Sequence, residues 1–143
     1  MSDVHVLISP DAGRGRTAGT SADVLDRFRA HGAHVIDLSG PTIEVSRSNA
    51  REAVAAGAER LVVVGGDGIV HLGLQAVADT QTVLGVIPVG TGNDFARGLD
   101  WIPDDPLDAV AVALHDPTPL DALRCGDRCP TDIGGGGTAA TIC

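Results

Sequence analysis

Lysine is absent from this sequence of 143 residues, so its ten basic side chains are all arginines. That absence excludes the P-loop, G-x-x-x-x-G-K-S/T, because its lysine reaches the nucleotide phosphates. Nineteen acidic residues leave a net charge of −9 at pH 7, and an acidic chain is repelled by a phosphate backbone. We therefore expect no nucleic-acid partner, and arginine has to supply any cation that a binding site needs.

Long apolar runs and cysteines are also scarce. The longest apolar runs, 61–64 and 83–89, are far shorter than the roughly 18–20 residues of a membrane-spanning helix, and the acidic N-terminus lacks a signal-peptide pattern. Cys125, Cys129 and Cys143 suit free thiols in a reducing compartment, since they are odd in number and gathered at one end. No nearby pair of histidines completes a zinc site around them. We expect a cytoplasmic protein.

Short apolar strands and amphipathic helices alternate along the chain. The apolar runs predict strands at 4–8, 33–38, 60–64, 83–89 and 118–123. Helical spacing predicts helices from a capping box at Thr20 and Asp23 to Gly32, over 47–56 with Gly57 after it, beyond Gly68, and over 104–115. Because parallel strands need such crossovers, the order predicts one α/β domain with an open, mostly parallel sheet and helices on both faces. Residues 129–143 show no apolar periodicity and are expected to be loosely ordered.

Three glycine-rich loops, at 13–15, 65–68 and 90–92, each follow a predicted strand. The carboxyl ends of parallel strands share one edge of the sheet, where ligands of such folds bind. Glycine lets the backbone approach an anion, and the free N–H groups at the following helix start point at it. One such loop alone is better explained as a tight turn, but three at one edge favour a phosphate site.

Two aspartates, Asp67 and Asp94, lie inside or beside these glycine turns. A carboxylate beside phosphate oxygens is repelled unless it binds a bridging divalent cation, holds a donor or accepts a proton. All three roles suit phosphoryl transfer. The simpler alternative is that Asp67 caps a helix that begins near Ile69, and that Asn93 or Asp94 caps another.

A dinucleotide-binding fold is a competing interpretation. Gly13 and Gly15 follow the first strand, and Asp37 at the end of the second could receive a ribose hydroxyl. However, Gly19 lies one place too far along for the third glycine of G-x-G-x-x-G, and Pro10 interrupts the tight turn. The pattern therefore favours phosphate loops of another kind.

In their wider context the three loops read SPDAGRG at 9–15, GGDG at 65–68 and PVGTGNDFAR at 88–97. In order and spacing these segments resemble the catalytic domain of the diacylglycerol kinase family. That family includes bacterial soluble lipid kinases and sphingosine kinases, and is more distantly similar to NAD kinases. The resemblance covers residues 4 to about 124, and two loops together make it specific.

By this resemblance, ATP lies across the three loops and its γ-phosphate passes to a lipid hydroxyl, such as that of diacylglycerol. Asp67 and Asp94 are then the catalytic residues and hold Mg²⁺. The resemblance implies a nucleotide site made by Pro10, Asp11, Ala12, Gly13, Arg14, Thr42, Gly65, Gly66, Asp67, Gly68, Ile69, Val70, His71, Gly90, Thr91, Gly92 and Asn93. It also implies a nucleotide-binding domain at 1–124, an atypical tail at 125–143, and transient contact with the inner face of the membrane.

The sequence departs from the family's pattern at several positions. Ser9 stands where the family commonly has Asn, Ile69 stands where it has Thr, and His71-Leu72 replaces Asn-Glu. Losing hydroxyl and amide groups weakens the nucleotide contacts implied there. His71 offers a donor in place of Asn, although a histidine at a helix start is as often a plain solvent-facing residue.

Length is the largest departure. Family members carry a second, β-rich domain that closes the cleft and supplies lipid-binding surface and further acidic residues, and this sequence ends near where it would begin. We expect a truncated or frame-altered product, or a nucleotide-binding half that acts with another chain or as a homo-oligomer. The leading interpretation is an ATP-dependent lipid kinase. The alternatives are a non-catalytic nucleotide-binding module and an NAD(P)-binding oxidoreductase domain.

Overall fold

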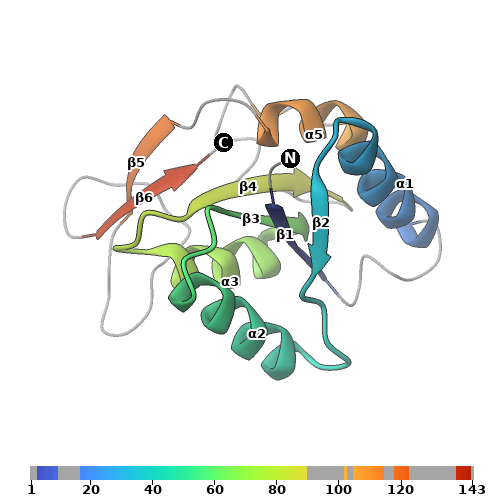
Figure 1. Cartoon of the computed structure of the whole chain (residues 1–143). Coiled ribbons are helices and arrows are strands. Elements are labelled where there is room, and N and C mark those ends of the chain that lie inside the picture. The colour runs from blue at the N-terminus through green and yellow to red at the C-terminus, as the bar shows by residue number, and fades with distance from the viewer. Residues whose placement is uncertain are drawn as a thin grey trace.

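The computed structural model describes residues 3–9, 17–89, 102, 105–114, 118–122 and 138–142. Strands and helices alternate along it (Figure 1), as the sequence predicts. The elements are β1 (Asp3–Ile8), α1 (Thr17–Ala30), β2 (His34–Asp37), α2 (Ile43–Ala55), β3 (Arg60–Gly65), α3 (Asp67–Val77), β4 (Val83–Pro88), α5 (Pro106–Ala113), β5 (Thr118–Ala122) and β6 (Thr138–Ile142).

The strands form one sheet in the order β2-β1-β3-β4-β6-β5. All neighbours are parallel except β5, which runs antiparallel to β6. The chain builds outward from β1 to β2, then crosses back and continues on the other side through β3 and β4. The predicted open, mostly parallel α/β sheet is confirmed, and the direction of building reverses between β1 and β3.

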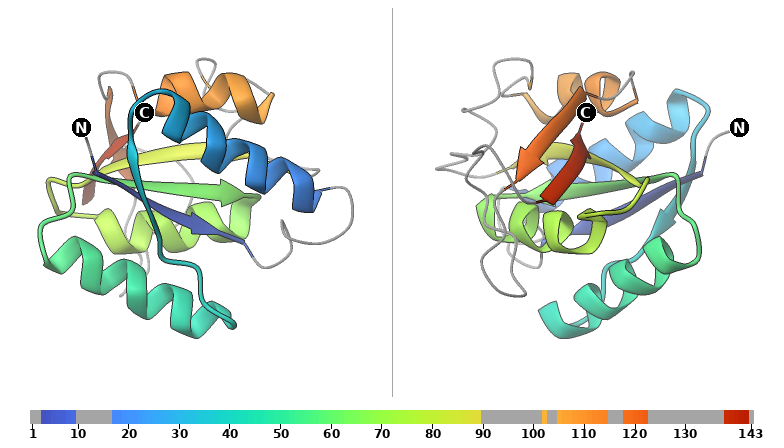
Figure 2. Two further views of the ribbon diagram at one scale, coloured as in Figure 1. Left: turned by 45° about the vertical axis from the view of Figure 1, so that its right-hand side comes forward. Right: turned by 90° about the vertical axis from the view of Figure 1, so that its left-hand side faces the viewer.

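Helices cover both faces of the sheet, α1 and α5 on one and α2 and α3 on the other (Figures 1 and 2). Successive side chains of the central strand β3 pack alternately into the hydrophobic cores on the two faces of the sheet. Leu61 and Val63 belong to the core under α2 and α3, whereas Val62 and Val64 belong to the core that contains Phe28 of α1. All four β3 side chains are fully buried, which explains why this strand reads as an unbroken apolar run.

Two helices begin earlier than predicted. α1 starts at Thr17, so the proposed capping box at Thr20 and Asp23 lies inside the helix and is wrong. A threonine followed three residues later by an acid also fits a helix interior, so that pattern alone does not locate the start. α2 starts at Ile43, with Thr42 as its N-cap. Gly57 follows the end of α2 with a φ of +94°, as expected for a glycine at that position.

The tail contains an ordered strand that the sequence analysis did not predict. Residues 138–142, expected to be loosely ordered, form β6 between β4 and β5. Thr141 and Ile142 pair with Val83 and Leu84 at the start of β4. The segment Thr-Ala-Ala-Thr-Ile has three β-branched residues, which favour a strand once a partner edge is present. The rest of the tail lies outside the described residues.

Among the helices that the structure describes, none combines the length and the apolar character that crossing a membrane requires.

Candidate functional site

The carboxyl ends of β1 and β3 lie side by side at the point where the sheet changes its direction of building. Ile8 pairs with Val64, and the next amide, Ser9 N, donates to the carbonyl oxygen of Val64 at 2.9 Å. On the far side of β3, Val89 N donates to the carbonyl oxygen of Gly65 at 3.1 Å. The chain therefore leaves β1, β3 and β4 toward the three predicted loops from one edge of the sheet, and a crevice at such a reversal is the usual ligand site of this architecture.

Gly65 ends β3 in a space that admits no side chain. Its φ is +149°, and a Cβ atom there would lie 2.7 Å from Ser9 Cβ and 2.9 Å from Ile69 Cγ2. Real Cβ atoms essentially never approach that closely. The glycine is thus required by the packing of the end of β1 against the first turn of α3.

Gly66 and Gly68 differ from Gly65 because neither has the positive φ that favours glycine. Gly66 is the N-cap of α3 with extended backbone, φ −98° and ψ −163°, and makes no side-chain capping bond. A Cβ at Gly68 would meet nothing within 4 Å, and Gly68 is exposed. The α3 start thus offers backbone N–H groups with no capping side chain from its N-cap residue, which is the feature that binds anions in many proteins.

Asp67 is the first residue of α3 and is half-buried. The alternative in which Asp67 caps a helix beginning near Ile69 is wrong, because the cap is Gly66. A carboxylate in the first turn still interacts favourably with the helix dipole. Asp67 therefore lies at the start of α3, at the reversal point of the sheet, and its role beside a bound phosphate stays a prediction.

Ile69 and Val70 contribute to the core rather than to a polar site. Their side chains are 3% and 2% exposed and belong to the core under α2 and α3. Val70 N donates to the carbonyl oxygen of Gly66 at 3.2 Å, closing the first turn of α3. Any contact of these two residues with a nucleotide would come from the backbone, and their role there stays a prediction.

His71 lies one turn into α3 and is half-buried. Its Nε2 is 2.6 Å from Nε2 of Gln75 on the next turn. Because an amide nitrogen donates, the fitting tautomer has His71 Nε2 as acceptor and the proton on Nδ1. His71 therefore has a side-chain partner within α3, and its replacement of an asparagine donor stays a prediction.

Thr42 lies at the same edge, beyond the end of β2, and is exposed. Its Oγ1 accepts from Val45 N at 3.3 Å and caps α2. Capping alone accounts for a threonine here, since it satisfies one of the N–H groups that a helix start leaves open. Its proposed contact with a nucleotide remains a prediction.

The turn after β2 contains polar residues that the sequence analysis gave no role in a phosphate site. Ser39 Oγ accepts from Ile8 N at 2.9 Å, and Asp37 Oδ1 accepts from Ser39 N at 2.9 Å. The second bond gives Asp37 a local purpose that needs no ribose. An aspartate that bonds the backbone two residues on is a known turn signature, so the Asp-x-Ser spacing was the available signal.

The remaining predicted site residues lie outside the described residues: Pro10, Asp11, Ala12, Gly13, Arg14, Gly90, Thr91, Gly92, Asn93 and Asp94. Within the described ranges, no group of three or more His, Cys, Asp or Glu side chains gathers to hold a metal. Mg²⁺ differs from structural metals because one or two carboxylates and the substrate's phosphates usually hold it. Asp67 at the edge fits that limited requirement by the chemistry of its oxygens.

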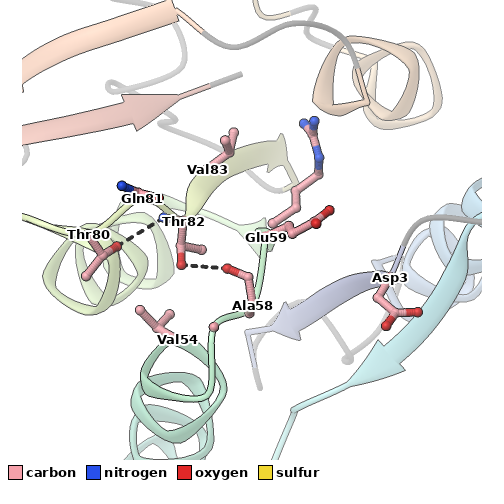
Figure 3. A pocket seen from close by; sticks show the side chains of 10 residues that line it. Asp3, Val54, Ala58, Glu59, Thr80, Gln81, Thr82 and Val83 are labelled. Carbon is pink, nitrogen blue, oxygen red and sulfur yellow. Dashed lines mark hydrogen bonds between the residues drawn. The ribbon is translucent and has the colours of Figure 1, made fainter.

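A hollow lies at the opposite edge of the sheet, near the amino ends of the strands (Figure 3). It measures about 460 Å³, and Asp3, Arg60 and Thr82 are among the residues that line it. Thr82 Oγ1 donates to the carbonyl oxygen of Ala58 at 2.7 Å, so this hydroxyl is used within the fold. The hollow is remote from the reversal point and shares no residue with the predicted phosphate site.

Comparison with known proteins adds to this geometry. Residues 3–125 match the family model of the diacylglycerol kinase catalytic domain. The chain is 37% identical over 114 residues to a diacylglycerol kinase of Mycobacterium tuberculosis strain H37Rv, covering 80% of this chain and 37% of that protein. It is 30% identical over an alignment of 144 residues to a diacylglycerol kinase of Bacillus subtilis strain 168, covering 96% of this chain and 46% of that one.

A crystal structure of a diacylglycerol kinase from Bacillus anthracis strain Sterne has the same fold, with a TM-score of 0.73 at 22% identity. That match covers 90% of this chain and 49% of the other. The chain thus spans less than half the length of each of these proteins. The predicted resemblance is confirmed by the match over residues 3–125: this chain belongs to the diacylglycerol kinase catalytic domain family, a family of lipid kinases.

Proposed function

We propose that the chain binds ATP with Mg²⁺ at the carboxyl edge of its sheet and forms the nucleotide-binding part of a lipid kinase. The reaction is transfer of the γ-phosphate to a lipid hydroxyl, with diacylglycerol as the first substrate to test. The relatives from Mycobacterium tuberculosis and Bacillus subtilis support this choice of substrate, since both are diacylglycerol kinases. A membrane-embedded substrate also implies transient contact with a membrane surface.

The observation that carries the proposal is the coincidence of GGDG with the reversal point between β1 and β3. Open α/β sheets bind their ligands outside the carboxyl ends of the strands at this point. The rival dinucleotide-binding order builds from the first strand to the second and third on one side. Here the third strand lies on the other side of β1, which argues against the oxidoreductase alternative.

At the start of α3, the backbone and the Asp67 side chain have different proposed roles in binding the phosphates. Backbone N–H groups that follow Gly66 receive phosphate oxygens, and Gly68 leaves room for their approach. Asp67, with Asp94 as its proposed partner, would hold Mg²⁺, which neutralises phosphate charge during transfer. The chain has no lysine, so we assign the cationic contact to an arginine, with Arg14 of the first loop as the proposed residue.

The described part of the chain exposes little apolar surface on which a lipid substrate could bind. Val45, 40% exposed, is the one large apolar side chain that lies exposed there. A lipid acceptor needs apolar surface and exclusion of water from the transfer site. We therefore expect ATP binding by this chain together with very slow lipid phosphorylation.

The proposed domain boundary at residue 124 comes from the motifs alone, and β6 argues for extending the same domain to Ile142.

The proposed function is tested first by thermal unfolding of the 143-residue chain with ATP–Mg²⁺ and, separately, with NADH. A ligand that binds only the folded state adds about 2.7 kcal/mol at a hundredfold excess over its Kd. For a domain of this size that corresponds to a rise in Tm of roughly 8 °C. We expect the rise with ATP–Mg²⁺ and none with NADH, and the opposite result would overturn the proposal.

Transfer is then measured with γ-labelled ATP and diacylglycerol in mixed micelles, with the Asp67→Asn variant as the matched control. Slow labelling that disappears in the variant would support a kinase. Nucleotide binding with no labelling by either protein would instead support the non-catalytic module.

A further inference from the structure

The hydrogen-bond ladder between β1 and β2 ends in an irregular way. Leu38 N donates to the carbonyl oxygen of Val6 at 2.8 Å, as a parallel ladder requires. In the next bond of a regular ladder, Ile8 N would donate to the carbonyl oxygen of Leu38. Here it donates to Oγ of Ser39 at 2.9 Å instead. The Leu38 carbonyl oxygen accepts from Nδ2 of Asn49 at 3.0 Å. A side-chain hydroxyl therefore takes the place of a backbone acceptor at the end of β1.

Ser39 is itself held on both sides. Asp37 Oδ1 accepts from Ser39 N at 2.9 Å. The following amide, Gly40 N, donates to Oγ of Ser46 at 2.9 Å, and Ser46 is fully buried. A Cβ at Gly40 would lie 2.5 Å from a methyl carbon of Val45, so the turn packs closely against α2. Ser39 itself is exposed, and these hydrogen bonds hold the turn that places its hydroxyl against β1.

The other side of the same β1 segment is fixed by β3. Ser9 N donates to the carbonyl oxygen of Val64 at 2.9 Å, and Ser9 Cβ lies close enough to Gly65 to exclude any side chain there. Ile8 and Ser9 are therefore held by the turn after β2 on one side and by the end of β3, just before α3, on the other. They are the last described residues before the first glycine-rich loop.

We infer that Ser39 is a positioning residue for the nucleotide site. By accepting the Ile8 amide it holds the end of β1, where Ser9 packs against Gly65, and so fixes the end of β1 beside the Gly66–Gly68 turn. The inference rests on the proposed function, because it takes the ligand of this edge to be a nucleotide. Its chemistry requires only a hydroxyl acceptor at this position, so threonine should replace serine and alanine should not.

The test uses the whole chain and compares wild type with Ser39→Ala and Ser39→Thr. Two quantities are measured: the Kd for ATP–Mg²⁺ by calorimetry, and hydrogen–deuterium exchange of peptides that cover residues 4–16, without nucleotide. The matched control is Thr82→Val, which removes a buried hydroxyl bond to Ala58 at the opposite edge of the sheet. Asp37→Ala, which removes the support of Ser39, serves as a second variant if Ser39→Ala does not fold.

We expect Ser39→Ala to weaken ATP binding by about three- to tenfold, the loss that one ordinary hydrogen bond can transmit, and to speed exchange at Ile8 in the unliganded chain. Ser39→Thr should restore both. Thr82→Val should lower the Tm while leaving the Kd unchanged, and Asp37→Ala should act in the same direction as Ser39→Ala with a smaller effect.

Several results would overturn the inference. If wild type binds ATP and Ser39→Ala binds it equally well, the proposed function stands and the positioning role falls. Weaker binding with unchanged exchange would make Ser39 a direct ligand contact, and equal weakening in Thr82→Val would make the effect one of general stability. If wild type binds no ATP, the proposed function fails and the inference fails with it.

Discussion

Gly65 and Gly68 lie three residues apart in the GGDG loop, and the structure predicts opposite responses to the same substitution. A Cβ at Gly65 would lie 2.7 Å from Ser9 Cβ and 2.9 Å from Ile69 Cγ2, at a φ of +149°. Overpacking costs about 1–3 kcal/mol, and an unfavourable backbone conformation adds roughly another 1–2 kcal/mol. A Cβ at Gly68 meets nothing within 4 Å, and alanine in a helix is more stable than glycine by roughly 0.5–1 kcal/mol.

We therefore expect Gly65→Ala to lower the free energy of unfolding by about 2–5 kcal/mol, whereas Gly68→Ala leaves it equal or slightly raised. The measurement is urea unfolding followed by circular dichroism, with the slope m compared between variants to check that the unfolding transition itself is unchanged. Equal stability of Gly65→Ala and wild type would refute the reasoning, because it would mean that the end of β1 and α3 can separate without cost. A destabilised Gly68→Ala would contradict the open space at that position.

Three further substitutions probe the same edge. Asp67→Ala should cost at most about 1 kcal/mol of stability, the size of a charge–dipole interaction, yet abolish any γ-phosphate transfer; turnover equal to wild type would leave Asp67 a purely structural role. Gly66→Val should fold, because the Gly66 backbone is extended, but should weaken ATP binding more than Asp67→Ala does, since a branched side chain blocks backbone approach; calorimetric Kd values that match wild type would remove the phosphate-cradle argument. Thr42→Ala should lose about 1 kcal/mol through the missing cap of α2, with Thr42→Ser as the control that keeps the Tm; a Tm unchanged in Thr42→Ala would show that the 3.3 Å contact to Val45 is not a stabilising cap.

The central strands could be predicted from sequence because each is buried on both faces. Residues 61–64 show this most clearly, since their full burial produces a continuous apolar run that few other structures explain. β6 could not be found in this way. It is short, and it pairs with β4 at two residues only, so its formation depends on a partner edge that the local sequence does not describe. The start of α1 was missed because the Thr20–Asp23 pattern fits a helix interior as well as a cap.

The site was predicted in part for a related reason. The position of Gly66–Gly68 after a strand follows from local sequence, and the edge to which it belongs follows from parallel strand direction. The order of the strands does not, and the reversal between β1 and β3 emerged only from the structure. The bond between Ile8 and Ser39 joins residues 31 positions apart. A contact of this kind depends on strand order and register, which a single sequence leaves open.

The GGDG loop also shows why a motif should not be assigned to one cause. Gly65 is demanded by packing against Ser9 and Ile69, so it would be needed even if no ligand bound at this edge. Gly66 has a backbone that other residues adopt, and Gly68 has open space around it. The fold therefore explains the first glycine, but it gives Gly68 no packing reason and Gly66 no conformational reason to be glycine. A ligand that approaches the backbone at the start of α3 supplies that reason, so the phosphate argument rests on Gly66 and Gly68, with Asp67 between them.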